Sequence, residues 1–283
     1  MHELRSFYLK KLDLIDIKSD YVFKRVFTLS DDIFIDFANS VLNYSNERKI
    51  KSVQFLNNEI MKDSEIDKES RFDIIAKLND NSYINIEMQV QNTGEYEKRS
   101  LYYWSKLYEL QLKKTQNYMQ LFPAICINVL DFNFFKSSND FYTQLGIVNL
   151  KTQEHIFNDF QIIYLEIPKF TKKYYNDLEK WMQFLKGASK KEIIAMENKN
   201  IIKAYEILEF VSHDPIERAK YEARRKFQLD HNTSLLTAEK RGIEKGVEKE
   251  KITIAIKMLN QGFPIDQISE LTQLSCEEIK NLK

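Results

Sequence analysis

Three residues whose types suit metal-dependent chemistry lie on two predicted neighbouring strands. Residues 82–90 alternate between apolar and polar side chains, a period that is typical of a strand. Glu87 and Gln89 are two positions apart, so their side chains leave the same face at a separation of about 6–7 Å. Asp73 lies in the short β-branched run 72–78, which we predict to be the preceding strand.

The turn between these strands decides whether Asp73 and Glu87 share a face. Residues 79–81 read Asn-Asp-Asn, which is typical of a turn. A two-residue turn would put the two carboxylates on opposite faces, because side chains alternate along a strand. We therefore predict a three- or five-residue loop, or a bulge, with Asn79 or Asn81 in the left-handed conformation. In that register Asp73 lies opposite or diagonal to Glu87, and Gln89 is a neighbour.

Two carboxylates held this close are costly unless a cation lies between them. Mg²⁺ suits that position, because it typically takes one or two protein carboxylates, keeps several waters and accepts phosphate oxygens. Such an ion could orient a water and stabilise charge on a phosphodiester during hydrolysis. The alternative is an Asp and a Glu on a solvated sheet face, and spacing alone leaves that alternative open.

The rest of the sequence predicts the elements that must position these residues. Helical patterns cover residues 19–46 and 95–118, and apolar runs predict further strands over 53–61, 123–131 and 161–167. From about residue 171 the strands stop and helical patterns continue, with breaks near Gly187, Asp214-Pro215 and Gln261-Gly262. A hairpin followed by a strand-helix-strand step predicts a mixed sheet with helices on it, which is an α/β core.

The composition excludes several classes of protein. The 283 residues contain 42 Lys plus Arg and 42 Asp plus Glu, so no overall charge attracts nucleic acid, although a local patch stays open. Two cysteines are too few for a disulfide framework or a Cys-based zinc site. No apolar run is long enough to span a bilayer, and the charged N-terminus is unlike a signal peptide. We therefore expect a cytoplasmic protein with no membrane partner.

Several stretches together resemble a known family. They read SDYVFKRVF at 19–27, RFDIIAKLNDNSYINIEMQVQ at 71–91, EKRSLYYWSKLYELQL at 97–112, and the tail 241–279. In this order they resemble the PD-(D/E)xK nuclease family transposases, also called recombination-promoting nucleases. The resemblance implies a restriction-endonuclease-like mixed sheet flanked by helices, with an all-helical C-terminal extension. The expected divisions are a nuclease-like core over 1–170, a helical extension over 171–240 and a C-terminal segment over 241–283.

The resemblance also implies roles for particular residues. Asp73 matches the motif aspartate and Glu87 the acidic residue of the next strand, so both are expected to bind Mg²⁺, for which Mn²⁺ could substitute. Gln89 stands where the wider superfamily has a lysine, and a neutral amide can only orient water by hydrogen bonds. Asp20 matches an N-terminal acidic position that could reach the metal. The alternative for Asp20 is a plain helix N-cap.

Three basic residues are candidate contacts for DNA phosphates. Lys24 lies one helical turn after Asp20, and Lys98 and Arg99 open the helix that follows the predicted site strand. Arg99 is the better phosphate ligand, because its guanidinium is planar and permanently charged. The alternative for Lys98 and Arg99 is a solvated helix end. The aromatic residues 102–104 are expected to be core rather than a base-stacking surface.

The C-terminal segment resembles a helix-turn-helix. Ser275 and Glu278 have the spacing of a capping box, and an apolar set is expected to pack together: Ile265, Ile268, Leu271, Leu274, Ile279 and Leu282. The last helix offers Glu277 and Glu278 instead of a basic surface, which argues against insertion into the major groove of DNA. We expect these helices to mediate homo-oligomerisation or docking on the core.

These observations predict a metal-dependent DNA endonuclease that hydrolyses phosphodiester bonds, with DNA as its partner. A second reading is a catalytically weak or inactive relic of the nuclease fold that binds DNA or protein. A third is an interaction protein whose function lies in the helical tail. Convergence of Asp73 and Glu87 would favour the first reading, divergence the second, and an exposed apolar patch on the tail the third.

Overall fold

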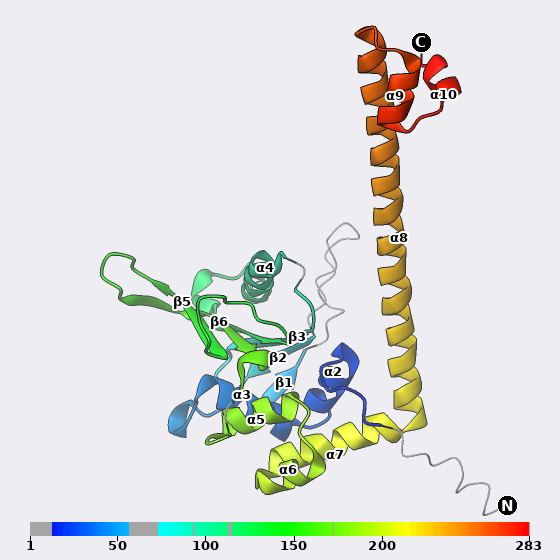
Figure 1. Ribbon diagram of the computed structural model, residues 1–283. Coiled ribbons are helices and arrows are strands. Elements are labelled where there is room, and N and C mark those ends of the chain that lie inside the picture. The colour runs from blue at the N-terminus through cyan, green and yellow to red at the C-terminus, as the bar shows by residue number, and fades with distance from the viewer. Residues whose placement is uncertain (1–12, 57–72, 93, 113–114, 172, 283) are drawn as a thin grey trace, which may run out of the picture. The chain divides into compact units, whose positions relative to one another are not determined.

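The computed structural model describes residues 13–56, 73–92, 94–112, 115–171 and 173–282. Its centre is a six-stranded sheet in the order β1-β2-β3-β4-β6-β5 (Figure 1). The strands are β1 (Val53–Phe55), β2 (Ile74–Leu78), β3 (Tyr83–Gln89), β4 (Ala124–Leu130), β5 (Tyr142–Val148) and β6 (His155–Glu166). The pairs β3–β4 and β4–β6 are parallel and the other pairs are antiparallel, so the sheet is mixed.

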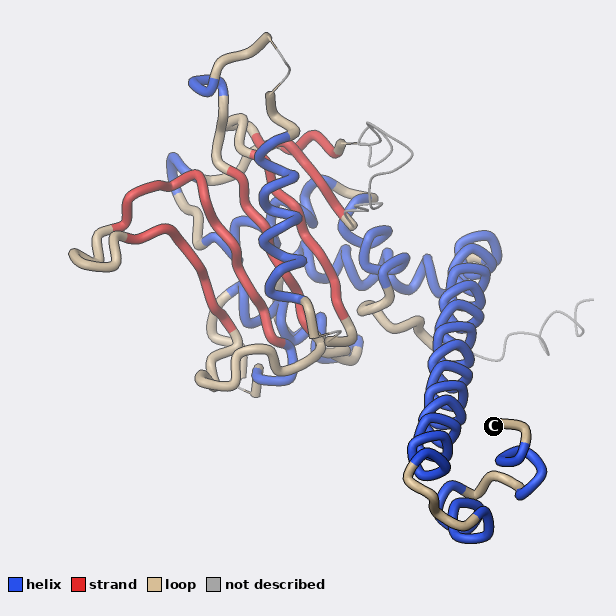
Figure 2. The backbone as a smooth tube through the Cα atoms, turned by 90° about the horizontal axis from the view of Figure 1, so that it is seen from above, coloured by secondary structure: helices blue, strands red, loops and turns tan. Residues whose placement is uncertain are grey.

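Helices cover both faces of this sheet. One face packs against α2 (Asp20–Thr28), α3 (Asp31–Leu42), α5 (Asp177–Leu185), α6 (Lys190–Ala195) and α7 (Lys199–His213). The other face packs against α4 (Tyr96–Glu109), which lies over the sheet and runs roughly along its strands in Figure 2. Because α4 connects the parallel strands β3 and β4, these three elements form a strand-helix-strand unit. The predicted α/β class with a mixed sheet is confirmed.

Side-chain alternation explains the two faces. Ile84, Ile86 and Met88 of β3 belong to the core under α2 and α3, as the sequence predicts. Val90 was expected on the same face, but β3 ends at Gln89 and Val90 is half exposed. The intervening positions of β3 point to the α4 side, so the polar residues of the strand lie beneath a helix.

The β5–β6 hairpin is the main part of the sheet that the sequence pattern does not predict. Residues 161–167 were predicted as a strand, whereas β6 begins at His155 and pairs with β5, a strand that was not anticipated. Most of β5 and the first residues of β6 are exposed, so no buried face imposes an apolar period on them. The helix predicted over 95–118 ends at Glu109, and the part of the strand predicted over 53–61 that follows residue 56 lies outside the described residues.

The β2–β3 turn has the geometry that puts Asp73 and Glu87 on the same face of the sheet. Ile74 pairs with Ile86 and Ala76 with Ile84, so paired residues have numbers of equal parity. The amide of Leu78 donates to the carbonyl of Ser82 at 2.9 Å, which closes a three-residue loop. Asn81 has a φ of 68°, in the left-handed region. Both the predicted phase and the predicted left-handed asparagine are confirmed.

The left-handed Asn81 leads to a testable prediction. Asn81→Val should destabilise the protein by about 1–2 kcal/mol, because a β-branched residue is strained at positive φ. Asn81→Gly should leave the stability equal or slightly higher, because glycine adopts this conformation freely. Urea unfolding of the two variants measures the difference, and equal destabilisation by both would contradict the explanation.

The chain divides into two compact units, residues 1–221 and 222–283. The second contains most of α8 (Pro215–Asn260) together with α9 (Ile265–Thr272) and α10 (Cys276–Lys280). Its core holds Ala255, Ile268, Leu274 and Ile279, with Ile252, Met258, Leu259, Ile265 and Leu282 packed on it. The predicted capping box of Ser275 and Glu278 is confirmed. The prediction that Leu271 packs here is wrong, because 70% of Leu271 is exposed.

None of the helices within the described ranges is both long enough and apolar enough to cross a membrane.

Candidate active site

The two carboxylates of the candidate site face each other across the β2–β3 ladder. Asp73 directly precedes β2, and the pairing of Ile74 with Ile86 places it across from Glu87. The amide of Asp73 donates to Oε1 of Glu87 at 3.1 Å, and the amide of Met88 donates to Oδ2 of Asp73 at 2.9 Å. Each carboxylate is therefore held by the backbone of the opposite strand. The structure brings Asp73, Glu87 and the neighbouring Gln89 together, as the register argument predicts.

This side of β3 is buried. Glu87 is 1% exposed and Asn85 is fully buried, because α4 covers them. The alternative of a solvated sheet face is therefore wrong for Glu87, and Asp73 is partly buried. A strand that alternates apolar and polar residues normally has one wet face, but here both faces are covered, and only the tertiary structure reveals it.

Burial perturbs both carboxyl groups. The pKa of Asp73 is raised to about 6, and burial is the largest cause. The charge of Asp20 also raises this pKa, whereas the hydrogen bond from the Met88 amide and the charges of Arg99 and Lys24 lower it. Burial and then the charge of Asp73 raise the pKa of Glu87 well above its ordinary value. Two acidic groups with raised pKa values in one buried place are typical of a functional site, because like charges in a protein interior need a compensating cation.

The donor atoms fit a hard divalent cation. Oε1 of Glu87 accepts from the Asp73 amide and from Nδ2 of Asn85 at 3.2 Å. Oε2 of Glu87 and Oδ1 of Asn85 are buried without a hydrogen-bond partner among the described residues. An unsatisfied buried acceptor costs about 1–3 kcal/mol, which a positively charged ligand would relieve. Oδ2 of Asp73 accepts from the Met88 amide, so Oδ1 is the oxygen of Asp73 that a cation would bind. An all-oxygen set of two carboxylates suits Mg²⁺ or Mn²⁺.

Asp20 and Lys24 lie within electrostatic reach of this pair. Asp20 is the first residue of α2, and its side chain accepts from the amide of Tyr21 at 2.6 Å. Its charge raises the pKa of Asp73, whereas the charge of Lys24 lowers it. Within the described part of the chain, no group of three or more His, Cys, Asp or Glu side chains is close enough to hold a metal ion. That Asp20 is a third ligand stays a prediction.

The two basic residues at the start of α4 differ in their surroundings. Arg99 is partly buried, and its Nη1 donates to Oε1 of Gln89 at 3.4 Å. Its charge lowers the pKa values of both Asp73 and Glu87. Lys98 is exposed, and its charge is not among the causes named above for the pKa shift of either carboxyl group. Of the three predicted phosphate contacts, Arg99 and Lys24 therefore act on the site electrostatically.

Sequence reasoning did not single out the polar residues that line the buried side of the sheet. The hydroxyl of Tyr96 donates to Oδ1 of Asn128 at 2.8 Å, and Nδ2 of Asn128 donates to the carbonyl of Ile163 at 3.2 Å. Asn85 donates to Glu87. The available signal is an asparagine inside an otherwise apolar strand, which needs a hydrogen-bond partner and so predicts a polar network.

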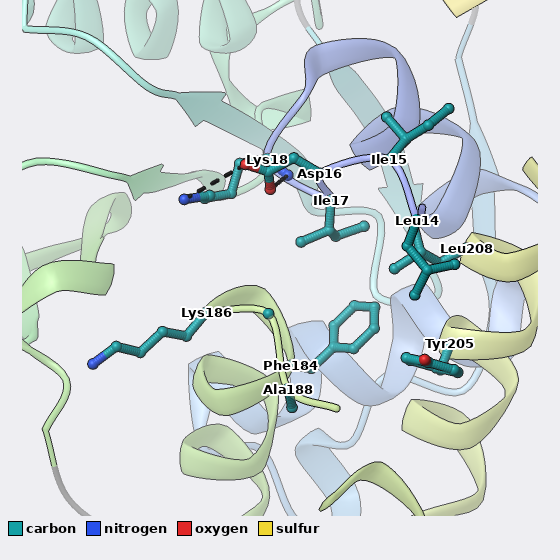
Figure 3. A pocket seen from close by; sticks show the side chains of 11 residues that line it. Leu14, Ile15, Asp16, Ile17, Lys18, Phe184, Lys186, Ala188, Tyr205 and Leu208 are labelled. Carbon is teal, nitrogen blue, oxygen red and sulfur yellow. Dashed lines mark hydrogen bonds and ion pairs between the residues drawn. The ribbon is translucent and has the colours of Figure 1, made fainter. Parts of the chain in front are cut away.

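One described pocket lies on the other side of the sheet. It has a volume of about 270 Å³ between residues 14–18, the end of α5 and α7, and Figure 3 shows Phe184 and Tyr205 facing that segment. Small-molecule sites usually begin at about 300 Å³ and contain convergent polar groups. Here the walls are mostly core side chains such as Ile15 and Ile17, so this pocket is a packing feature beside the site and not a second active site.

Comparison with known families agrees with this geometry. The family model described as PD-(D/E)XK nuclease family transposase matches residues 17–238. A model described as the C-terminal HTH domain of the Rpn/YhgA-like nuclease family matches residues 248–283. The comparison with curated proteins and the comparison with solved structures each gave no match. Both family matches cover stretches that carry the resemblance, and the mixed six-stranded sheet flanked by helices is consistent with the first family's fold.

Proposed function

Because the chain belongs to the PD-(D/E)XK nuclease family transposases, we propose that it is a metal-dependent DNA endonuclease that hydrolyses phosphodiester bonds. The observation that carries the proposal is the reciprocal pairing of Asp73 and Glu87, with a buried Glu87 oxygen that lacks a partner in the described chain. Nucleases of this fold typically use a divalent metal ion, and an HTH domain is typically used to bind DNA.

In this proposal each residue of the site has a defined task. Asp73 and Glu87 hold Mg²⁺ or Mn²⁺, with Asp20 as a candidate third ligand. When bound, such an ion supplies a Lewis acid that lowers the pKa of a coordinated water and offsets charge on the phosphate. Gln89 orients the attacking water by hydrogen bonds. Lys24 and Arg99 contact DNA phosphates, and Lys98 is the more peripheral contact.

The direct test is cleavage of supercoiled plasmid and linear DNA by the full chain with Mg²⁺, with Mn²⁺ and with EDTA. Nicking or linearisation with either metal, absent in EDTA, is the expected result. If the folded protein binds DNA but cuts none of a varied set of substrates in either metal, the proposed nuclease activity is overturned. That result would favour the catalytically inactive relic that binds nucleic acid.

The surface of the C-terminal unit favours a second function, which is self-association. The described part of α8 exposes a series of large apolar side chains: Phe227, Leu229, Leu235, Leu236, Ile243 and Val247. Leu229, Leu236 and Ile243 recur every seven residues, and Val247 follows Ile243 by four, a spacing that is typical of a helix-helix seam. We propose that this helix mediates homo-oligomerisation. Light scattering of the full chain and of Leu236→Glu/Ile243→Glu measures the mass, and a monomer at micromolar concentration in the unmutated chain would contradict the proposal.

A further inference from the structure

Arg99 is a cation in contact with Gln89, a position where the strand brings no charge. Its Nη1 donates to Oε1 of Gln89, so the guanidinium and the end of the Gln89 amide are in contact. Gln89 follows Glu87 by two residues on the same face of β3. The contact therefore places a permanent positive charge beside the acidic pair, although the strand itself supplies a neutral side chain at this position.

The charge of Arg99 reaches both carboxylates. It lowers the pKa values of both Asp73 and Glu87. The charge of Lys24 also lowers the pKa of Asp73. Burial opposes the charged form of Arg99, but Tyr103, Glu87 and Tyr96 hold its pKa above the ordinary value. Arg99 therefore stays protonated throughout the reaction. A fixed positive charge in a low-dielectric site stabilises a developing negative charge far more than one in water does.

The helix holds the guanidinium in a defined place. The Cζ atom of Arg99 lies 5.1 Å from the ring centre of Tyr103 and 6.0 Å from that of Tyr96. Tyr96 lies one helical turn before Arg99 and Tyr103 lies one turn after it, so all three residues share one face of α4. Nε of Arg99 is buried and has no acceptor among the described residues. A buried donor of this kind needs an oxygen, and a phosphodiester oxygen beside the carboxylate pair would supply it.

We propose that Arg99 is a catalytic residue that donates to the scissile phosphate and provides the positive charge that Gln89 lacks. The inference deepens the proposed function and rests on it. In the hydrolysis, a water oxygen forms a bond to phosphorus while the bond from phosphorus to one sugar oxygen breaks. The water loses one proton to solvent, and the leaving sugar oxygen gains one. Arg99 keeps its protons and stabilises the charge on the phosphoryl oxygens. Tyr103 and the Oε1 atom of Gln89 orient the guanidinium, and the amide nitrogen of Gln89 remains to orient the attacking water.

The decisive experiment compares Arg99→Gln, Gln89→Lys and the double variant Arg99→Gln/Gln89→Lys with the unmutated chain. Single-turnover cleavage at saturating protein concentration separates the chemical step from DNA binding. Arg99→Gln should slow cleavage by about 10²–10³-fold, because one charged donor to the transition state is lost. Adding Gln89→Lys should restore at least about tenfold of that loss, because a lysine there offers its charge to the same phosphate. Lys106→Gln, on the same helix and away from the site, is the matched control and should stay within about twofold.

Metal binding supplies a readout that does not depend on activity. Titration of the DNA-free protein with Mn²⁺, followed by electron paramagnetic resonance, should show tighter binding to Arg99→Gln than to the unmutated chain by about 3–10-fold. The reason is that a cation which repels the metal has been removed. A merely structural role for Arg99 would weaken the site instead. Thermal unfolding identifies any variant that fails to fold, in which case Arg99→Lys replaces Arg99→Gln.

The outcomes separate the two proposals. If the unmutated chain cleaves DNA and Arg99→Gln cleaves at the same saturated rate, the inference is overturned and the nuclease stands. The same holds if the double variant is no faster than Arg99→Gln and Mn²⁺ affinity is unchanged. If the folded, unmutated chain cleaves no DNA in either metal, the proposed function fails and the inference fails with it.

Discussion

Asp73→Asn and Glu87→Gln should each reduce metal-dependent cleavage by at least about 10³-fold while making the metal-free protein more stable. The loss of activity follows because each change removes a proposed charged ligand, and a bound metal contributes several kcal/mol to transition-state stabilisation. The gain in stability follows because the metal-free site holds two buried carboxylates that repel each other. Opposite signs for activity and stability are the signature of a site that is strained in the absence of its ligand.

The stability gain should depend on pH. The folded-state pKa of Asp73 is about 6 against an ordinary value of 3.8, and that of Glu87 also lies well above its ordinary value. Between the unfolded and folded pKa values the native state binds more protons, so the stability of the metal-free protein falls as pH rises through this window. Glu87→Gln and Asp73→Asn should therefore differ little from the unmutated chain near pH 4. At pH 8 they should be more stable by roughly 1–3 kcal/mol.

Urea unfolding in EDTA at pH 4.5, 6 and 8 measures this dependence, and plasmid nicking with Mn²⁺ measures the activity. Glu47→Gln is the matched control, because Glu47 is exposed in the short helix before β1 and should change neither quantity. Adding Mn²⁺ at pH 8 should stabilise the unmutated chain and not the double variant Asp73→Asn/Glu87→Gln. Destabilisation of both single variants at pH 8 without metal would refute the assignment of a strained carboxylate pair.

Glu217→Ala is expected to destabilise the first unit by about 3 kcal/mol, because it removes the acceptor at the centre of a buried polar cluster. Glu217 is 5% exposed and lies at the start of α8. It accepts from the Tyr21 hydroxyl at 2.6 Å and from Nε and Nη2 of Arg25 at 2.8 and 3.0 Å. Both partners belong to α2, the helix that carries Asp20 and Lys24. The cluster therefore joins a helix of the C-terminal half of the chain to the helix beside the candidate site.

The contribution of Glu217 should vanish in acid. Burial alone would raise its pKa, but hydrogen bonds from Tyr21, Arg25 and Lys220 and the charge of Arg25 lower it to about 2. A depressed pKa means that this contribution is fully present above pH 4.5 and is lost as pH falls toward 2. The difference between Glu217→Gln and the unmutated chain should therefore shrink over that interval. Glu222→Gln, which breaks only an exposed pair with Arg225, should cost at most about 0.5 kcal/mol at any pH.

Chemical unfolding of these variants at pH 7 and pH 3 tests the prediction. Equal destabilisation by Glu217→Ala and Glu222→Gln would contradict the role of the cluster. The rate of DNA cleavage by Glu217→Gln is a second measurement. This rate should fall because the weakened cluster lets α2 shift, although Glu217 does not contact the carboxylate pair.

Local periodicity was sufficient to predict the elements whose faces are buried. The alternation in β3, the asparagine-rich turn and the resulting parity of the ladder predict that Asp73 lies across from Glu87, as it does in the structure. The apolar run of β4 and the breaks at Asp214-Pro215 and Gln261-Gly262 also agree with the structure. The sequence pattern failed where burial is weak, as in the exposed β5 strand. A surface hairpin carries no apolar period that could distinguish it from a loop.

The residues of β2 and β3 thus determine which side chains share a face, because the two-residue period of a strand and the turn geometry are local properties. Only the tertiary structure decides that α4 covers this face. That helix buries Glu87, which raises the pKa of this carboxyl group, and it brings Arg99 against Gln89. Dielectric environment and charge proximity depend on segments that are distant along the chain, and no local pattern encodes them. The carboxylate pair is therefore readable from the sequence, whereas the electrostatic environment of the pair arises from the packing of α4 and α2 around it.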